Sequence, residues 1–226
     1  MSAGLRGRVL LVVALAPEPS YLVQFDAGRE ARMRRSALAA APLDPSRVAL
    51  SATVYNFDIA LADVDRGVYE DIAFKAARQP SETEEYLVSR VIAYCLEYAE
   101  GIAFSRGIAE PDVPALGVYD LTGAMQVWVD VGAPDAARLH KASKASPRVA
   151  IYTHRDPAQL LRQYAGERIH RAEALELHAI DRSLIEELVA RLDRRNKWAV
   201  SVTERHLYVT IGDSTIEGDV VRHPLT

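Results

Sequence analysis

The stretch that decides the fold is MQVWVDVGAPDAARLHKASKASPRVAIYT, residues 125–153. Its first seven residues alternate between two faces, which is the pattern of a β-strand. Gly132 ends this strand, and Pro134 begins a helix to about Lys144, since proline is favoured in the first turn of a helix. The nearly continuous apolar run at 148–153 is typical of a strand covered on both faces. The stretch therefore predicts a strand, a helix and a second strand parallel to the first.

Regular patterns on both sides of this stretch complete an α/β chain. Alternating residues at 53–61 and 72–76 indicate a β-hairpin. After the stretch we expect, in order, a helix from Pro157 to about Tyr164, a strand at 174–180, an amphipathic helix at 183–192, and two or three short strands at 198–221.

The most regular helix of the sequence should follow the hairpin. Ser81-Glu82-Thr83-Glu84 matches a capping box, in which Ser81 caps the helix and Glu84 reaches back to the cap. The helix should end near Ala99, with Arg90 pointing away from its apolar side. Cys95 lies on the apolar side and is expected to be a small core residue.

Composition places the chain among ordinary globular proteins. It has 226 residues, of which 49% are hydrophobic and 26% charged, and no apolar run approaches the roughly 18 residues of a membrane helix. The single cysteine excludes an internal disulfide framework and multi-cysteine zinc sites, so we expect a cytoplasmic protein. The net charge of -4 is divided unevenly, with +3 in residues 1–47 and -7 in the remainder. The acidic body should not bind nucleic acid by its overall charge.

Residues 1–47 differ from the rest of the chain. Arg6 and Arg8 precede an apolar run that ends in Ala14-Leu15-Ala16, which has the form of a secretory signal. The alternatives are a disordered extension or a true start near Val48, where the regular pattern begins. We expect residues 1–47 to be an extension of one of these kinds, and residues 48–226 to be the folded domain.

Four residues are candidates for chemistry. Asp130 ends a strand, where ligand sites of α/β sheets collect, and Glu85, Asp112 and Lys141 lie at a helix start, in the preceding connection and on the following helix. Two or three carboxylates suit Mg²⁺ or Mn²⁺, and a lysine can stabilise charge that grows on a phosphate. The alternatives are structural: first-turn acids complement the helix dipole, Asp112 and Asp130 can be turn residues, and Lys141 can be a solvated lysine.

Other chemistries lack their motifs. The sequence has no Gly-x-x-x-x-Gly-Lys loop, no Gly-x-Gly-x-x-Gly, no Gly-x-Ser-x-Gly and no His-Glu-x-x-His. Its six histidines show no ligand spacing.

Several spaced motifs in this order resemble the bacterial YaeQ family, and the likeness covers residues 48–226. They are ALSATVY at 49–55, PSETEE at 80–85 with Arg90, LTG at 121–123, VWVDVG at 127–132, PD at 134–135 with Arg138, KA at 141–142, and VAIYT at 149–153. The resemblance implies a fold like that of the PD-(D/E)XK nucleases, similar to the restriction endonucleases, with a central mixed sheet flanked by helices and added β-hairpins.

The same resemblance implies roles for the four candidate residues. Glu85 is then the helix carboxylate, Asp112 the first acid and Asp130 the acid of the (D/E)XK motif, all three holding Mg²⁺ or Mn²⁺. The motif lysine should lie two residues after Asp130, but that residue is Gly132, so Lys141 must substitute from the next helix. Two further departures are Val113, where a Glu is common, and Ala133, where a Gln is common.

Two functions remain open at this point. The first is a metal-dependent phosphodiesterase that acts on nucleic acid. The second is a non-catalytic binding module of nuclease fold with a role in transcription or RNA regulation, acting on nucleic acid or a transcription complex. The acidic body and Gly132 favour the second function, whereas the retained acids favour the first.

Overall fold

The structure is a computed structural model that describes residues 7–14, 20–25, 30–34, 52–105 and 113–225, with side chains from residue 52 onward. The chain divides into two units, at residues 1–49 and 50–226. No helix of the described residues is long and apolar enough to cross a membrane.

The first unit contains a three-stranded antiparallel sheet. Its strands are β1 (Gly7–Ala14), β2 (Ser20–Phe25) and β3 (Glu30–Arg34), in that order. Sequence patterning predicted no strand here. That residues 1–47 are an extension and residues 48–226 the folded domain stays a prediction.

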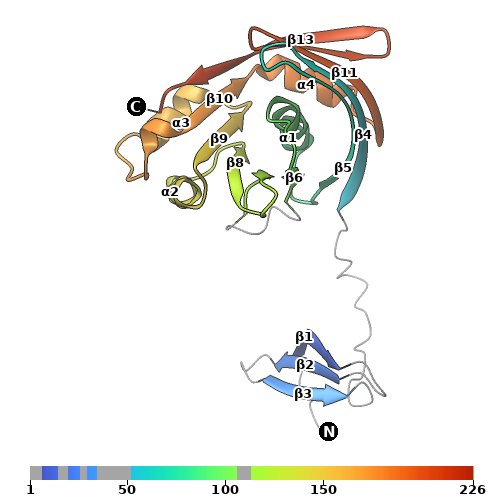
Figure 1. Ribbon diagram of the computed structural model, residues 1–226, viewed down its shortest axis with the longest axis vertical. Coiled ribbons are helices and arrows are strands. Elements are labelled where there is room, and N and C mark those ends of the chain that lie inside the picture. The colour runs from blue at the N-terminus through green and yellow to red at the C-terminus, as the bar shows by residue number, and fades with distance from the viewer. Residues whose placement is uncertain (1–6, 15–19, 26–29, 35–51, 106–112, 226) are drawn as a thin grey trace. The chain divides into compact units, whose positions relative to one another are not determined.

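The second unit is built on a ten-stranded mixed sheet that curls around helix α1 (Glu84–Leu96), as Figure 1 shows. The strand order is β5-β4-β11-β12-β13-β10-β9-β8-β7-β6. The rings of Phe74 on β5 and Phe104 on β6 have centroids 5.2 Å apart, so the two edge strands of the sheet approach each other. The sheet is therefore nearly closed. The strands are β4 (Thr53–Asp63), β5 (Val68–Arg78), β6 (Ile102–Phe104), β7 (Leu116–Tyr119), β8 (Met125–Val131), β9 (Arg148–Thr153), β10 (Glu176–Ile180), β11 (Arg195–Thr203), β12 (His206–Ile211) and β13 (Ser214–His223).

The predicted strand-helix-strand unit is confirmed. Strands β8 and β9 are parallel and in register, with Val129 beside Ala150, and α2 (Ala136–Ala145) joins them. Pro134 lies before this helix and not in its first turn, because the carboxylate of Asp135 caps it by accepting the Arg138 backbone N–H at 2.7 Å.

The two faces of β8, β9 and β10 carry separate apolar cores. Val129 and Tyr152 pack on the inner side with α1 and α4 (Arg182–Ala190). Trp128 and Ile151 pack on the outer side with α2 and α3 (Pro157–Tyr164). Both faces of these parallel strands are thus covered, as their apolar sequence predicted.

The capping box predicted from Ser81 and Glu84 is wrong. Thr83 is the N-cap of α1, and its hydroxyl accepts the Tyr86 backbone N–H at 3.2 Å. Because the helix begins at Glu84 itself, that carboxylate does not complete a capping box and instead accepts the Tyr55 hydroxyl at 3.4 Å.

Strand β13 connects the two halves of the sheet. Its first residues pair with β12 and its last four, 220–223, pair with β10. Helix α4 lies directly against it at Gly218, where an added Cβ would lie 2.8 Å from the Cβ of Leu184. A larger residue at 218 would therefore push α4 off the sheet.

Candidate functional site

Asp130 lies near the end of β8 and is 2% exposed. Its two carboxylate oxygens accept hydrogen bonds from one guanidinium, that of Arg138, at 2.8 Å from Nε and 2.6 Å from Nη2. Arg138 also donates to the Val113 carbonyl at 2.8 Å and lies over the ring of Trp128 at 5.5 Å. Burial lowers the pKa of Arg138, but its hydrogen bond and charge interaction with Asp130 outweigh this and raise it. Asp130 and Arg138 thus form a bidentate salt bridge.

The Asp130–Arg138 pair lines a pocket of about 310 Å³ at the C-terminal end of β8. Arg155, which follows β9, is exposed and has no ion-pair partner among the described residues. The Ser105 hydroxyl is buried and makes no hydrogen bond to any described residue. The pocket thus contains two guanidinium groups, of which Arg138 is already paired with Asp130, and one hydroxyl without a hydrogen-bond partner in the described part of the chain. Other lining residues are Tyr86, Val113, Pro114, Ala115, Val131, Gly132, Ala133 and Pro134.

Glu85 occupies the first turn of α1 but does not line this pocket. Hydrogen bonds with its own backbone and with Thr83 lower its pKa. Near it, His154 Nδ1 lies 3.0 Å from the buried Ser89 hydroxyl. Burial and the charge of Arg155 lower the pKa of His154. Glu85 therefore belongs to a neighbouring polar group rather than to the Asp130 pocket.

The other two predicted residues are placed differently. Lys141 is exposed in the second turn of α2 and is not among the pocket residues. Asp112 lies outside the described residues, and the next residue along the chain, Val113, lines the pocket. The roles predicted for both residues stay predictions.

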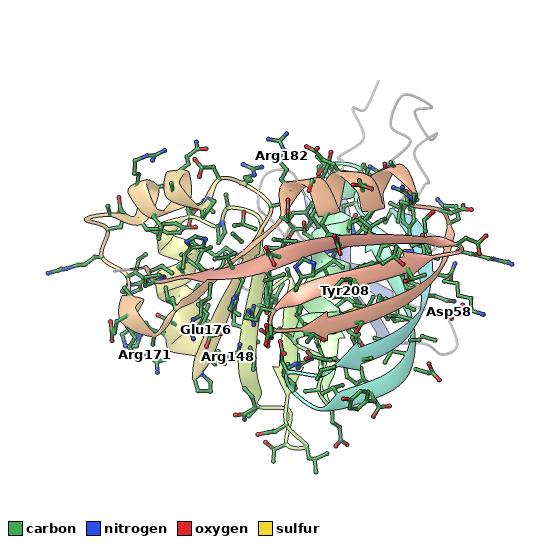
Figure 2. All side chains as sticks on the ribbon, turned by 90° about the horizontal axis from the view of Figure 1, so that it is seen from above. Asp58, Arg148, Arg171, Glu176, Arg182 and Tyr208 are labelled. Atoms are coloured by element: carbon green, nitrogen blue, oxygen red, sulfur yellow. The ribbon has the colours of Figure 1, made fainter. Side chains whose placement is uncertain are left out.

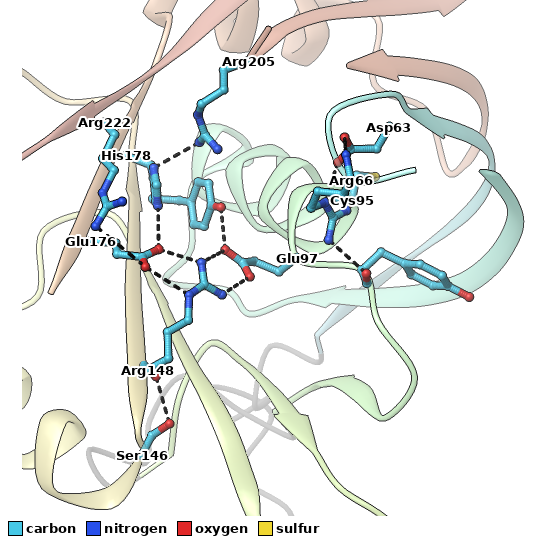
Figure 3. A network of polar contacts seen from close by, with 12 residues as sticks. Asp63, Arg66, Cys95, Glu97, Ser146, Arg148, Glu176, His178, Arg205 and Arg222 are labelled. Atoms are coloured by element: carbon cyan, nitrogen blue, oxygen red, sulfur yellow. Dashed lines mark hydrogen bonds and ion pairs between the residues drawn. The ribbon is translucent and has the colours of Figure 1, made fainter. Parts of the chain in front are cut away.

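A second polar cluster, which sequence reasoning missed, lies where α1 ends (Figure 3). Arg148 donates to both oxygens of Glu97, at 2.5 and 3.0 Å, and to both oxygens of Glu176, at 3.2 and 2.6 Å. The buried Tyr152 hydroxyl donates to Glu97 at 2.7 Å. Pairing with these two carboxylates raises the pKa of Arg148 despite its burial. No local spacing predicts this cluster, because its members come from α1, β9 and β10.

His178 extends the cluster as a neutral imidazole. Its Nδ1 lies 3.0 Å from Nη2 of Arg205, and a guanidinium can only donate, so Nδ1 accepts. The proton is then on Nε2, which donates to Glu176 at 3.3 Å. Burial and the charge of Arg205 lower the pKa of His178 to about 4. The ring also stacks on Tyr152, with centroids 4.8 Å apart.

In both clusters the described carboxylates are paired with arginine, and the predicted metal site stays a prediction because Asp112 lies outside the described residues. Ligand atoms of Glu97, Glu176 and His178 lie within 4.8 Å of one another, but Arg148 already binds all four carboxylate oxygens. At the pocket, the described residues supply one carboxylate, Asp130, and both its oxygens are bound by Arg138. The guanidinium beside each of these carboxylates places a positive charge where a divalent cation would bind, and this repulsion disfavours magnesium at both places.

Comparison with known proteins identifies the family. The family model described as YaeQ protein matches residues 48–220. The chain belongs to the YaeQ family. The match begins where the sequence pattern becomes regular, and it includes the Asp130 pocket and the Arg148 cluster.

Individual YaeQ proteins agree with this assignment. The chain is 35% identical to YaeQ of Escherichia coli K12 over 112 residues and 32% identical to YaeQ of Salmonella typhi over 111 residues. Each match covers 49% of this chain and 61% of the relative.

Two solved YaeQ structures share the fold. The crystal structure of YaeQ from Pseudomonas syringae matches with a TM-score of 0.68 and 31% identity, over 76% of this chain and 95% of that one. The structure from Xanthomonas axonopodis pv. citri matches with a TM-score of 0.70 and 26% identity, over 77% and 99%.

Proposed function

We propose that this YaeQ chain is a non-catalytic binding module that holds a phosphate group of nucleic acid in the Asp130 pocket. The observation that carries the proposal is the pairing of Asp130, which engages both of its oxygens with Arg138. A carboxylate held in this way orients a guanidinium at the pocket and has its charge balanced by that guanidinium rather than by a metal.

The remaining pocket groups suit an anion with several oxygens. Arg155 supplies a charge without a carboxylate partner among the described residues, and Ser105 supplies an unused hydroxyl. Arginine and hydroxyl donors are the usual partners of nucleic-acid phosphates. Since the rest of the body is acidic, binding depends on this local arrangement and should be weak and sensitive to salt.

The finer fold assignment is part of this proposal. Strands β7 to β10 with α1 and α2 would form the nuclease-like core, with Asp130 at the end of a central strand. We also propose a cytoplasmic location, which is favoured by a sequence whose single cysteine cannot form an internal disulfide.

The proposal is tested with labelled single-stranded and double-stranded DNA and RNA oligonucleotides, using fluorescence anisotropy over a range of salt concentrations. Arg155→Ala should weaken binding about tenfold and lower the slope of log K against log salt by about one, the signature of one lost phosphate contact. Arg162→Ala is the matched control, because Arg162 is an exposed arginine of α3 outside the pocket. Equal binding by both variants, or no binding by the wild type, contradicts the proposal.

The phosphodiesterase hypothesis is tested in the same samples. With Mg²⁺ or Mn²⁺ added, the wild type should neither cleave the oligonucleotides nor gain thermal stability, because the guanidinium of Arg138 balances the charge of Asp130 and repels the cation. Metal-dependent cleavage that is lost in Asp130→Asn would replace the binding module with the nuclease.

A further inference from the structure

The charges of residues 48–226 are divided unevenly along the sequence. Residues 132–175, which connect β8 to β10 and contain α2, β9 and α3, carry eight lysines and arginines against four acids, a balance of +4. The other residues of 48–226 carry 12 lysines and arginines against 23 acids, a balance of -11. The acidic total of the domain therefore conceals one basic part.

The helices of this basic part lie on the outside of the sheet. Figure 1 shows α2 and α3 on the outer side of β8, β9 and β10, away from α1. Leu139 and Ala142 of α2 are buried, whereas Lys141 and Lys144 are exposed and lie about one helical turn apart. After its cap, Asp135, the helix has no acidic residue. The exposed side of α2 therefore carries positive charge and no negative charge.

The loop that follows α3 packs against the second half of α2. His140 Nδ1 lies 3.0 Å from the carbonyl oxygen of Arg168, and since a carbonyl can only accept, the imidazole donates. The side chain of Arg171 donates to the carbonyl of Ser146, just after the end of α2, at 3.0 Å. Arg168 and Arg171 are both exposed, so they extend the basic side of α2 across this loop. We call these two arginines, together with the two exposed lysines of α2, the basic face.

The acids of this part of the chain do not cancel the charge of the basic face. Asp135 and Asp156 each cap a helix, where the positive end of the helix dipole partly balances their charge. Glu167 and Glu173 are the two remaining acids of residues 132–175, against the four exposed cations of the face. The basic face therefore keeps a net positive charge.

We propose that the basic face contacts the phosphate backbone of a nucleic-acid duplex, one phosphate of which lies in the Asp130 pocket. This inference rests on the proposed function and adds the surface along which the nucleic acid lies. Arg138 of the pocket belongs to the first turn of α2, so Lys141 and Lys144 follow it at about 4.5 and 9 Å along the helix axis. Because each strand of a duplex carries a phosphate about every 3.4 Å of its length, the phosphates next to the bound one come within reach of these lysines.

The basic face offers charge without a stacking platform, which favours a duplex over a single strand. The exposed large apolar side chains of the described residues all lie outside residues 132–175. Unpaired bases are held largely by stacking on aromatic side chains, whereas a duplex presents its backbone. The rest of residues 48–226, with its balance of -11, repels that backbone and directs it to this face. Binding should therefore be independent of base sequence.

The test is binding of the full chain to a fluorescent duplex of about 16 base pairs, or roughly one and a half helical turns, and to a single strand of the same length. Anisotropy over a range of salt concentrations gives the affinity and its salt dependence. The test variant is the double substitution Lys144→Gln and Arg168→Gln. Both side chains are exposed, so the variant should fold, and its melting curve checks this.

The matched control is the double substitution Lys75→Gln and Lys197→Gln, on β5 and β11. Both lysines are exposed, and Lys197 is the cross-strand neighbour of Asp58. Figure 2 shows Asp58 and Arg171 at opposite sides of the second unit. The control and the test variant lose the same amount of positive charge, so a difference between them reports where the charge lies and not how much there is.

The wild type should bind the duplex more tightly than the single strand, whatever the base sequence. The test variant should lose at least about tenfold in affinity, and the slope of log K against log salt should fall by about two, one for each lost phosphate contact. The control should keep both values. A test variant that binds like its control, or a wild type that prefers the single strand, overturns the inference.

Two further measurements separate this inference from its alternatives. If Arg155→Ala weakens binding and the test variant does not, the pocket is retained and the basic face is refuted. If the test variant weakens binding and Arg155→Ala does not, the proposed function of the pocket fails instead. An acidic protein is the other partner that a basic face could bind, so poly-glutamate is added as a competitor. Displacement of the duplex by an equal charge concentration of poly-glutamate would refute a nucleic-acid partner.

Discussion

Replacing His178 should remove a specific part of the pH dependence of folding. His178 is 3% exposed and neutral, with its pKa lowered from 6.5 to about 4. Between these values the unfolded chain binds a proton at this residue and the folded chain does not. Stability from this group is therefore complete above about pH 6.5 and falls as the pH is lowered toward about 4.

The size of the effect follows from the two pKa values. At 1.36 kcal/mol per pKa unit, the full loss is about 3 kcal/mol, and the part already lost at about pH 5 is about 2 kcal/mol. Burial of the ring means that solvent screening does not reduce this figure strongly.

The assay is urea unfolding of the wild type and of His178→Gln at about pH 7.5 and about pH 5, with the difference in unfolding free energy compared between the two conditions. Fluorescence of Trp128 and Trp198, both buried in the second unit, reports the transition. The unfolding free energy of the wild type minus that of the variant should fall by about 2 kcal/mol between the two pH values. Other titrating groups contribute equally to both proteins and cancel in this difference. A constant difference would mean that folding leaves the pKa of His178 unchanged, and a difference that grows at low pH would mean that the folded protein holds the charged imidazolium. Either result would refute the assignment of a neutral His178.

Three further predictions concern single contacts. Tyr152→Phe should cost about 1–3 kcal/mol in unfolding free energy, because the buried carboxylate of Glu97 loses a hydrogen bond of 2.7 Å. Thr83→Ala should lower the unfolding free energy by about 1 kcal/mol because the helix loses its cap, whereas Ser81→Ala should leave it nearly unchanged. The reverse result would support the capping box predicted from Ser81 and Glu84. A hydrogen bond to Asp219 and the nearby carboxylates raise the pKa of His206, so this residue stabilises the fold below its unfolded pKa and loses that effect as the pH rises through its folded pKa. In His206→Gln the melting temperature should therefore change less with pH over that range than it does in the wild type.

Elements made by neighbours in sequence could be predicted. The hairpin β4–β5 and the unit β8–α2–β9 follow from period and turn residues alone, and their pairing is confirmed. Their ends were less predictable, because a cap depends on which hydroxyl or carboxylate reaches the first free N–H groups. Thr83 and Asp135 do so in this chain, rather than Ser81 and Pro134.

Arg90 shows what local pattern cannot predict. Helical projection placed it away from the apolar side of α1, but it is 3% exposed. The sheet curls round α1, so residues on every side of the helix meet another element. Arg90 therefore pairs with Glu82 at 3.4 Å and lies 5.7 Å from the ring of Phe104. Closure of a sheet is a long-range property, and no window of the sequence contains it.

At the candidate site, the sequence could predict the acid, Asp130, but not its partner, Arg138. Asp130 could be singled out because it lies near the end of a strand. Whether such an acid binds a metal or an arginine depends on which charged side chains other elements bring next to it, and the sequence pattern does not show this. The nuclease resemblance expects a lysine two residues later, where Gly132 has a φ of 88° that other residues rarely adopt. A lysine at 132 would strain this turn, and the turn is what leads β8 into α2. The positive charge beside Asp130 is instead supplied by Arg138 of α2, which binds both oxygens. Glycine at 132 and arginine at 138 therefore fit one arrangement, in which the acid positions a guanidinium.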